Sequence, residues 1–169
     1  MLETDKMSSK YIVRRLNESN IDEILALCNG NTLFYQYCEA EMSKEQIIKD
    51  LHITPPGIDI SKKYYLGFYD GIKLIAIVDL IDGYPEDEIV FIGFFIVDIS
   101  VQGQGVGSSI IDHVANYLAS IGKTSIRLGI DKGNPQSTSF WKKNGFVVIQ
   151  EIDRGEWTVL LAEKNLYQS

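Results

Sequence analysis

The residues best suited to chemistry form a glycine-rich stretch near the middle of the chain, Val101 to Val114 (VQGQGVGSSIIDHV). Glycine has no Cβ, so Gly103, Gly105 and Gly107 let the backbone adopt positive φ and let successive N–H groups converge on one point. The residues that follow have the apolar spacing of a helix, whose first N–H groups are unpaired and lie at the positive end of its dipole. This order predicts a site for a phosphate or another anion.

Three classes of glycine loop bind phosphates, and two of them match this sequence poorly. A P-loop ends in Gly-Lys-Ser/Thr, whereas Gly107 is followed directly by Ser108. A dinucleotide-binding loop needs a third glycine where Ser108 stands and an acid about 20 residues later, and Asp131 comes too late for that role. A nucleotide-binding oxidoreductase is therefore the weakest of the three functions that the sequence leaves open. Taken alone, the glycine loop also matches a plain connector between a strand and a helix.

The third class has the pattern Gln-x-x-Gly-x-Gly, present here as Gln102, Gly105 and Gly107 after an apolar run. A second block follows at a fixed spacing, with Asn134, Ser137, Phe140-Trp141 and Gly145-Phe146. With both blocks in this order, the chain resembles the Gcn5-related N-acetyltransferase (GNAT) superfamily over Ile89 to Phe146. In that family the first block holds the diphosphate of acetyl-coenzyme A (acetyl-CoA), and the second holds its pantetheine arm.

The resemblance implies an α/β fold, with a mostly antiparallel mixed sheet, a splayed parallel strand pair and helices on both faces. Acetyl-CoA would enter the gap between the splayed strands, and no metal is implied. The cofactor-binding positions carried over from the family are Phe95, Ile96, Val97, Gln102, Gly103, Gln104, Gly105, Val106, Gly107, Ser108, Asn134, Ser137 and Trp141.

The activity implied by the resemblance is direct transfer of acetyl from acetyl-CoA to a primary amine of a small molecule or peptide, in a ternary complex. The backbone N–H of Val97 is the candidate that stabilises the carbonyl oxygen as charge develops on it. Many family members protonate the leaving thiolate with a tyrosine, but this chain has Trp141 there, and an indole N–H is no useful acid near neutral pH. Trp141 is expected either to pack against the cofactor arm or to be a core aromatic.

The general base is not supplied by the usual family positions, which are occupied here by Phe91 and Gly129. We expect a carboxylate from a neighbouring strand or loop, Asp79 or Glu88, to act directly or through water. The alternative for each carboxylate is an ordinary solvent-exposed side chain with no catalytic role. Further candidates, ranked behind these two, are Asp82, Tyr84, His52 and His113.

The missing tyrosine and acids keep open a second function, a non-catalytic domain that binds or senses acyl-CoA. Acceptor choice in this family depends on the segment corresponding to residues 29–56. Its aromatic and acidic side chains could together surround a cationic acceptor. Alternatively, the aromatic side chains pack in the core and the acidic ones face solvent. These residues are Phe34, Tyr35, Tyr37, Glu39 and Glu41.

An alternating order of strands and helices must position these residues. Apolar periodicity and turn signals predict strands at Tyr11 to Leu16, Tyr64 to Tyr69, Lys73 to Leu80, Ile89 to Val97, Thr124 to Ile130, Phe146 to Ile152 and Trp157 to Ala162. Helices are predicted after Asn20, from about Ser43, over Ser108 to Ile121 and over Pro135 to Asn144. Residues 1–9 are expected to be a flexible tail, and residues 10–169 a single domain.

Composition agrees with one soluble enzyme domain. The chain has 169 residues and 45% hydrophobic content, enough for one core. The net charge of -7 argues against nucleic acid and anionic membranes as partners. Two cysteines, and apolar runs too short for a membrane span, favour a cytoplasmic protein. The expected partners are acetyl-CoA and an amine, for a monomer or homodimer.

Overall fold

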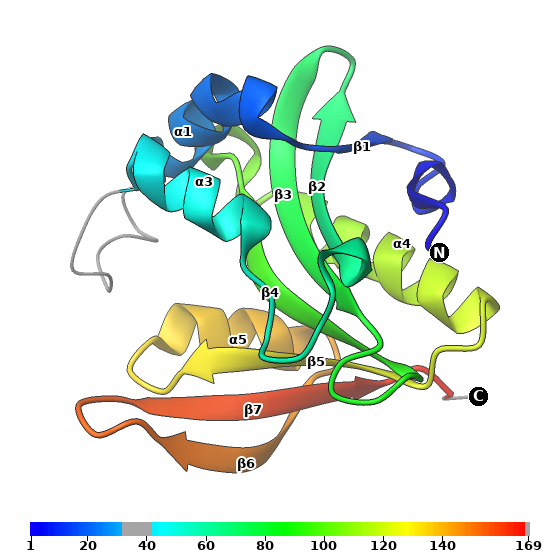
Figure 1. The fold of residues 1–169 in the computed structure, drawn as a ribbon, viewed down its shortest axis with the longest axis vertical. Coiled ribbons are helices and arrows are strands. Elements are labelled where there is room, and N and C mark those ends of the chain that lie inside the picture. Colours follow the sequence, from blue (N-terminus) through cyan, green and yellow to red (C-terminus); the bar gives the residue numbers. More distant parts are fainter. Residues whose placement is uncertain (32–41, 168–169) are drawn as a thin grey trace.

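The computed structural model describes residues 1–31 and 42–167, which form one seven-stranded mixed sheet with helices on both faces (Figure 1). The strands are β1 (Ile12–Arg15), β2 (Lys63–Asp70), β3 (Lys73–Asp82), β4 (Ile89–Val97), β5 (Ser125–Asp131), β6 (Val147–Asp153) and β7 (Thr158–Asn165). The α-helices are α1 (Ile21–Asn29), α3 (Lys44–His52), α4 (Val106–Ser120) and α5 (Pro135–Lys143). Short 3-10 turns are η1 (Thr4–Lys6), η2 (Glu18–Asn20), η3 (Ile60–Lys62) and η4 (Ile99–Val101).

The strand order is β1-β2-β3-β4-β5-β7-β6, and every neighbouring pair is antiparallel except β4 and β5. This confirms the predicted fold class, including the parallel pair joined through α4. The dipeptide Asp70-Gly71 is a strong sequence signal for a hairpin, and the structure has a tight turn between β2 and β3 with a φ of 61° at Gly71.

The two parallel strands separate partway along their length. Pairing between β4 and β5 covers only Ile89–Ile92 against Ser125–Leu128. Beyond Ile92, β4 continues to pair with β3, and β5 continues to pair with β7, so the sheet opens between them. An uninterrupted apolar run such as Ile89–Val97 predicts a strand that is covered on both faces, but Phe95 and Val97 in the far half of β4 are only half-buried. The divergence of β5 is the physical reason.

Helices cover the two faces of the sheet with separate apolar cores. On one face, α4 contributes Ile110, Ile111, Val114 and Leu118, and α5 contributes Trp141. On the other face, α1 and α3 pack against β2, β3 and β4 through Ile24, Leu27, Ile47 and Leu51. The opening between β4 and β5 therefore lies between a layer made by α4 and α5 and a layer made by α1 and α3 (Figure 1).

The N-terminal segment packs onto the domain. Met7 is 1% exposed, and Leu2 is buried with it in the core beside α4. The backbone N–H groups of Leu2 and Glu3 donate hydrogen bonds to the hydroxyls of Tyr64 and Tyr117. The expectation of a flexible tail over residues 1–9 weighed the polar residues of this segment and missed its two apolar anchors.

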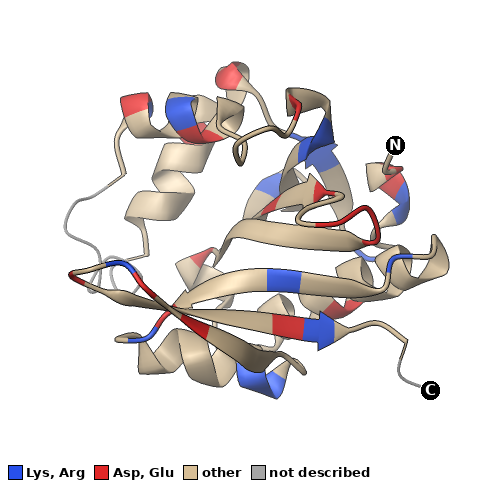
Figure 2. Ribbon diagram, turned by 60° about the horizontal axis from the view of Figure 1, so that its bottom comes forward, with Lys and Arg blue, Asp and Glu red and all other residues tan. Residues whose placement is uncertain are grey.

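Charges of both signs are spread over the described surface. In Figure 2, segments with Lys or Arg alternate with segments with Asp or Glu, and no continuous basic stripe crosses this view of the described residues. None of the helices in the described ranges combines the length and hydropathy that a bilayer-spanning segment needs.

Candidate active site

The loop between β4 and α4 is shaped by two glycines in the left-handed region. Gly103 and Gly105 have φ values of 76° and 77°, which strain any residue with a Cβ. Gly105 is the N-cap of α4, and its carbonyl accepts the first helical bond from the N–H of Ser109. The helix therefore begins at Val106, two residues earlier than the sequence predicted, because the left-handed turn at Gly105 already directs the chain into it.

This start leaves a group of main-chain donors at the opening. The N–H groups of Val106, Gly107 and Ser108 precede the first helical hydrogen bond, so they have no partner within α4. All three residues line a cavity of about 360 Å³. The N-terminal end of the α4 dipole adds to their preference for an anion.

The edge of β4 supplies further main-chain groups. Asp98 N–H bonds to the carbonyl of Ile75, which fixes the antiparallel alternation between β3 and β4. With that alternation, the N–H and C=O groups of Phe95 and the N–H of Val97 point away from β3 and toward the opening that β5 leaves. The carbonyl of Val97 is already used, because it accepts side-chain hydrogen bonds from Asn31 and Gln102. An extended amide-containing chain fits there as an added strand would.

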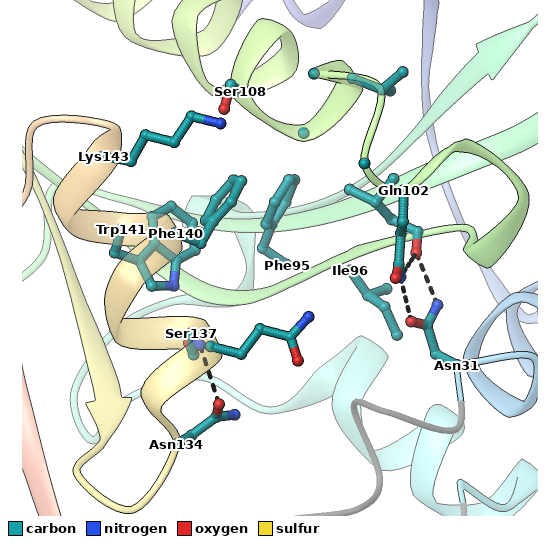
Figure 3. A pocket seen from close by; sticks show the side chains of 16 residues that line it. Asn31, Phe95, Ile96, Gln102, Ser108, Asn134, Ser137, Phe140, Trp141 and Lys143 are labelled. Atoms are coloured by element: carbon teal, nitrogen blue, oxygen red, sulfur yellow. Dashed lines mark hydrogen bonds between the residues drawn. The ribbon is translucent and has the colours of Figure 1, made fainter.

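Helix α5 forms the opposite wall. Asn134 caps it, accepting a hydrogen bond from the N–H of Ser137 at 3.0 Å, so Asn134 and Ser137 lie together at the cavity (Figure 3). Trp141 is 7% exposed and packs edge-on against Phe140, with ring centroids 4.9 Å apart. Phe95 of β4 stacks on Phe140 at 5.7 Å. Trp141 is thus a core aromatic that also forms part of the cavity wall; contact with the cofactor arm stays a prediction.

The cavity brings together all but one of the sequence-predicted cofactor residues. Those that line it are Phe95, Ile96, Val97, Gln102, Gly103, Gly105, Val106, Gly107, Ser108, Asn134, Ser137 and Trp141. Gln104 does not line it: its side chain is exposed and donates to the carbonyl of Ser100 at 3.3 Å.

Gln102 faces the protein rather than the anion-binding end of the loop. Its Nε2 donates to the carbonyl oxygen of Val97 at 2.9 Å and also to Oδ1 of Asn31. Asn31 is 2% exposed, and its Nδ2 donates to the same Val97 carbonyl at 2.7 Å (Figure 3). The side chain of Gln102 therefore holds the loop to the end of β4.

Sequence reasoning missed three residues that line this cavity, Asn31, Gln136 and Lys143, and it named Phe140 in the second block without counting it among the cofactor positions. Lys143 lies in the last turn of α5, and Figure 3 shows its side chain reaching toward Ser108 at the start of α4. The available signal was the basic pair Lys142-Lys143 in an otherwise acidic chain. Asn31 gave no signal, because it is distant in sequence from the glycine loop.

The structure separates the two predicted bases. Asp79 is buried on β3 opposite Phe94, and its Oδ2 accepts a hydrogen bond from Lys63 Nζ at 2.7 Å. Glu88 is exposed just before β4, at the end of that nine-residue strand farthest from the cavity, about 30 Å of extended chain from Val97. That separation is at odds with a catalytic role for Glu88.

The remaining candidates also lie away from the cavity. Asp82 pairs with Lys123 at 2.6 Å near the Glu88 end of the sheet, and Tyr84 packs edge-on against Phe91. His52 pairs with Glu18 at the surface, and His113 contacts Ser8. The predicted acceptor side chains Phe34, Tyr35, Tyr37, Glu39 and Glu41 lie outside the described residues. Within the described ranges, no group of three or more His, Cys, Asp or Glu side chains is arranged to hold a metal ion.

A family model described as the acetyltransferase (GNAT) family matches residues 25–146, which is most of the chain. The protein therefore belongs to the GNAT acetyltransferase family, whose members transfer acyl groups from acetyl-CoA. No curated protein matches the sequence.

Solved structures agree with the fold. An acetyltransferase from Thermus thermophilus is 16% identical, with a TM-score of 0.75, and the match covers 92% of this chain and 97% of that one. A spermidine N-acetyltransferase SpeG chimera from Vibrio cholerae and hSSAT is 19% identical, with a TM-score of 0.69 and coverage of 94% and 96%. The PaiA N-acetyltransferase from Thermoplasma acidophilum, solved in complex with coenzyme A, is 17% identical, with a TM-score of 0.66 and coverage of 92% and 98%.

Proposed function

We propose that this protein transfers acetyl from acetyl-CoA directly to a primary amine of a small molecule or peptide, in a ternary complex. The observation that carries the proposal is the convergence of three unpaired N–H groups, those of Val106, Gly107 and Ser108, on a cavity that continues along the open edge of β4. The diphosphate would bind these N–H groups, and the pantetheine arm would follow the edge of β4.

The charge balance of the cavity supports this orientation. Lys143 supplies a cation beside the amide groups of α4, although the whole chain carries a net charge of -7. No carboxylate is among the side chains that line the cavity in the described residues. A diphosphate therefore meets donors and a cation without a nearby negative charge.

The reacting end would lie at the inner part of the opening. The N–H of Val97, and that of Phe95 two residues before it, point toward the gap and are positioned to donate to the acetyl oxygen as negative charge develops there. Trp141 shapes the wall and does not act as an acid. A thiol with a pKa of about 8.5 is a fair leaving group without one.

Two measurements test the proposal. Calorimetric titration with acetyl-CoA should show one binding event, whereas NAD and ATP should bind far more weakly or not at all. Thiol release should then be followed with a panel of amines that includes spermidine, phosphinothricin and a peptide with an N-terminal alanine, chosen because structurally similar proteins are named for these acceptors. Acetyl-CoA binding with amine-stimulated thiol release supports the transferase, and absence of binding contradicts it.

A second function is favoured by one observation, the replacement of the usual acid and base positions by Trp141, Phe91 and Gly129. A non-catalytic acyl-CoA sensor would bind the cofactor with the same residues and release no thiol with any amine. The amine panel separates the two functions. We further propose a cytoplasmic location, for which the composition of the chain is the only support.

A further inference from the structure

A buried ion pair lies on the face of the sheet covered by α1 and α3. Lys63 of β2 donates from Nζ to Oδ2 of Asp79 at 2.7 Å, and the two side chains are 3% and 10% exposed. The other carboxylate oxygen of Asp79, Oδ1, is buried and has no hydrogen-bond partner among the described residues. A buried carboxylate with an unused acceptor is costly unless something else binds there.

The space beside Asp79 is left open by a glycine. Gly93 of β4 is exposed, and a Cβ placed on it would lie only 2.9 Å from Asp79 Oδ2. Any other residue at position 93 would fill the space next to the carboxylate. With glycine there, no side chain from position 93 covers the side of Asp79 that carries Oδ2.

This space lies where the parallel strands part. The last paired residue of β4 is Ile92, so Gly93 is the first residue beyond the pairing with β5. Phe95, whose N–H points into the opening, is two residues farther along, about 7 Å of extended strand. The carboxylate is therefore close to the place where the acetyl group would be held.

The surroundings of Asp79 favour a base that titrates near neutral pH. The groups that face it are Lys63 and Tyr65 from β2 and Asp50 from α3, whereas β4 contributes the uncharged Phe94 and Gly93. Burial raises the pKa of Asp79 from 3.8 to about 6, Lys63 opposes that rise, and Asp50 adds to it. Asp79 is thus ionised at neutral pH and can still accept a proton.

We propose that Asp79 is the catalytic base that removes the proton from the acceptor amine, directly or through one water molecule, and that Lys63 is a positioning residue that keeps Asp79 ionised and oriented. The inference rests on the proposed function and adds the residue that activates the acceptor. An acceptor that is an ammonium ion in solution suits this site, because Asp79 is a carboxylate beside the space left by Gly93 and its Oδ1 accepts no hydrogen bond from the described residues.

The reaction balances as follows. The ammonium group gives one proton to Asp79, and the nitrogen lone pair forms a bond to the acetyl carbon. The carbon–sulfur bond then breaks, and its electron pair leaves with the thiolate of coenzyme A. The second nitrogen proton is lost as the amide forms and ends on the thiolate, while Asp79 returns its proton to solvent. The net products are the N-acetyl amine, coenzyme A thiol and one proton.

The test is the pH profile of kcat/KM for thiol release, measured from pH 5 to 9 with the panel amine that the wild type acetylates fastest. We expect a loss of wild-type activity below about pH 6. Asp79→Asn should lower kcat/KM at neutral pH by roughly 100-fold or more, with the Kd for acetyl-CoA unchanged. Lys63→Met should move the acidic limb of the profile up by about 1 to 3 pH units, a change that a merely structural lysine would not cause.

Asp82→Asn is a matched control, because it removes a buried carboxylate of the same strand that pairs with a partly buried lysine, Lys123, nearer the Glu88 end of the sheet. It should leave the pH profile unchanged. Gly93→Ala should lower kcat/KM while both members of the ion pair are kept. If single variants fold poorly, the paired apolar replacement of Lys63 by Met and Asp79 by Leu should bind acetyl-CoA normally and lack turnover.

The possible outcomes distinguish a failure of Asp79 as the base from a failure of the proposed acetyl transfer. If the wild type releases thiol with an amine and Asp79→Asn keeps both its kcat/KM and its profile, Asp79 is not the base and the transferase assignment stands. If the wild type binds acetyl-CoA and acetylates no amine, the transferase assignment fails and the base assignment with it. If acetyl-CoA does not bind, the cofactor site itself is contradicted.

Discussion

Asn31 and Gln102 donate side-chain amide hydrogen bonds to one carbonyl oxygen, that of Val97, although they lie 71 residues apart in the chain. Asn31 follows the end of α1, and Gln102 begins the glycine loop. Their meeting point on β4 links the end of α1 with the glycine loop, which we propose binds the diphosphate. The loop geometry therefore depends on contacts from outside its own sequence.

Gln102→Ala should weaken acetyl-CoA binding without removing any direct contact to it. One net hydrogen bond contributes about 1 kcal/mol, so a fall in affinity of about fivefold is expected. Calorimetric titration measures it, and Gln104→Ala is the control because the Gln104 side chain is exposed and outside the cavity. Equal losses in both variants would contradict a specific role for Gln102.

Gly107→Val should abolish tight acetyl-CoA binding. A Cβ at position 107 would lie 3.2 Å from Phe140 and 3.4 Å from Val97, and the remaining valine methyls would enter the cavity. We expect at least a tenfold rise in Kd. Asp112→Val is the control, because it places the same β-branched residue at an exposed position of the same helix and so lowers helix propensity in the same way. This variant should bind acetyl-CoA normally. Normal binding by Gly107→Val would show that the cofactor does not approach α4 here.

Lys143→Gln should reduce acetyl-CoA affinity about two- to fivefold at low salt, since an exposed charge interaction contributes at most about 1 kcal/mol. The difference from the wild type should shrink as salt screens the interaction. Lys142→Gln is the matched control, because Lys142 is adjacent in the same turn and does not line the cavity. If the two variants behave alike at every salt concentration, Lys143 has no special role.

Trp141→Ala should lower the free energy of unfolding by about 3 to 5 kcal/mol, because it empties a site packed by Phe95, Phe140 and Phe146. Urea denaturation measures this. Trp157→Ala provides the comparison, since Trp157 is 53% exposed and its loss should change stability by no more than about 0.5 kcal/mol. A small change in the free energy of unfolding for Trp141→Ala would contradict a core position for Trp141.

Asp79 should make stability depend on pH in a characteristic direction. Because burial raises its folded-state pKa from 3.8 to about 6, the folded state binds the proton more tightly than the unfolded state. The contribution to stability is complete below about pH 3.8 and is lost as pH rises through about 6. At about 1.4 kcal/mol per pH unit, it amounts to about 3 kcal/mol.

Urea denaturation of the wild type and of Asp79→Asn at a series of pH values tests this contribution. The free energy of unfolding of the wild type, minus that of the variant, should fall between pH 4 and pH 7. The contributions of other titrating groups are the same in both proteins and therefore cancel in this difference. A difference that stays constant over this range, or that grows with pH, would contradict the raised pKa of Asp79.

The local features of the site were predictable from the sequence because each depends on neighbouring residues. Positive φ at Gly103 and Gly105, the helix after them and the cap at Asn134 all follow from residue type and spacing. The uninterrupted apolar run Ile89–Val97 likewise gave the exact bounds of β4. Here local propensity and tertiary structure agree.

The features that were missed depend on residues far apart in the chain. The partnership of Asn31 with Gln102, the approach of Lys143 to α4 and the pairing of Lys63 with Asp79 join different elements. Glu88 was a plausible base by proximity in sequence to β4, yet strand direction places it at the wrong end. The N-terminal segment was mistaken for a tail because two apolar anchors in nine residues are too few to show a period.

The central claim is that the main-chain amides at the start of α4 bind the diphosphate of acetyl-CoA. The most direct measurement is an amide NMR titration of the wild-type protein with acetyl-CoA. The account predicts that the N–H signals of Val106, Gly107 and Ser108 shift most, and that those of Phe95 and Val97 shift with the same Kd. Saturable binding that leaves these five amide signals unmoved would contradict it.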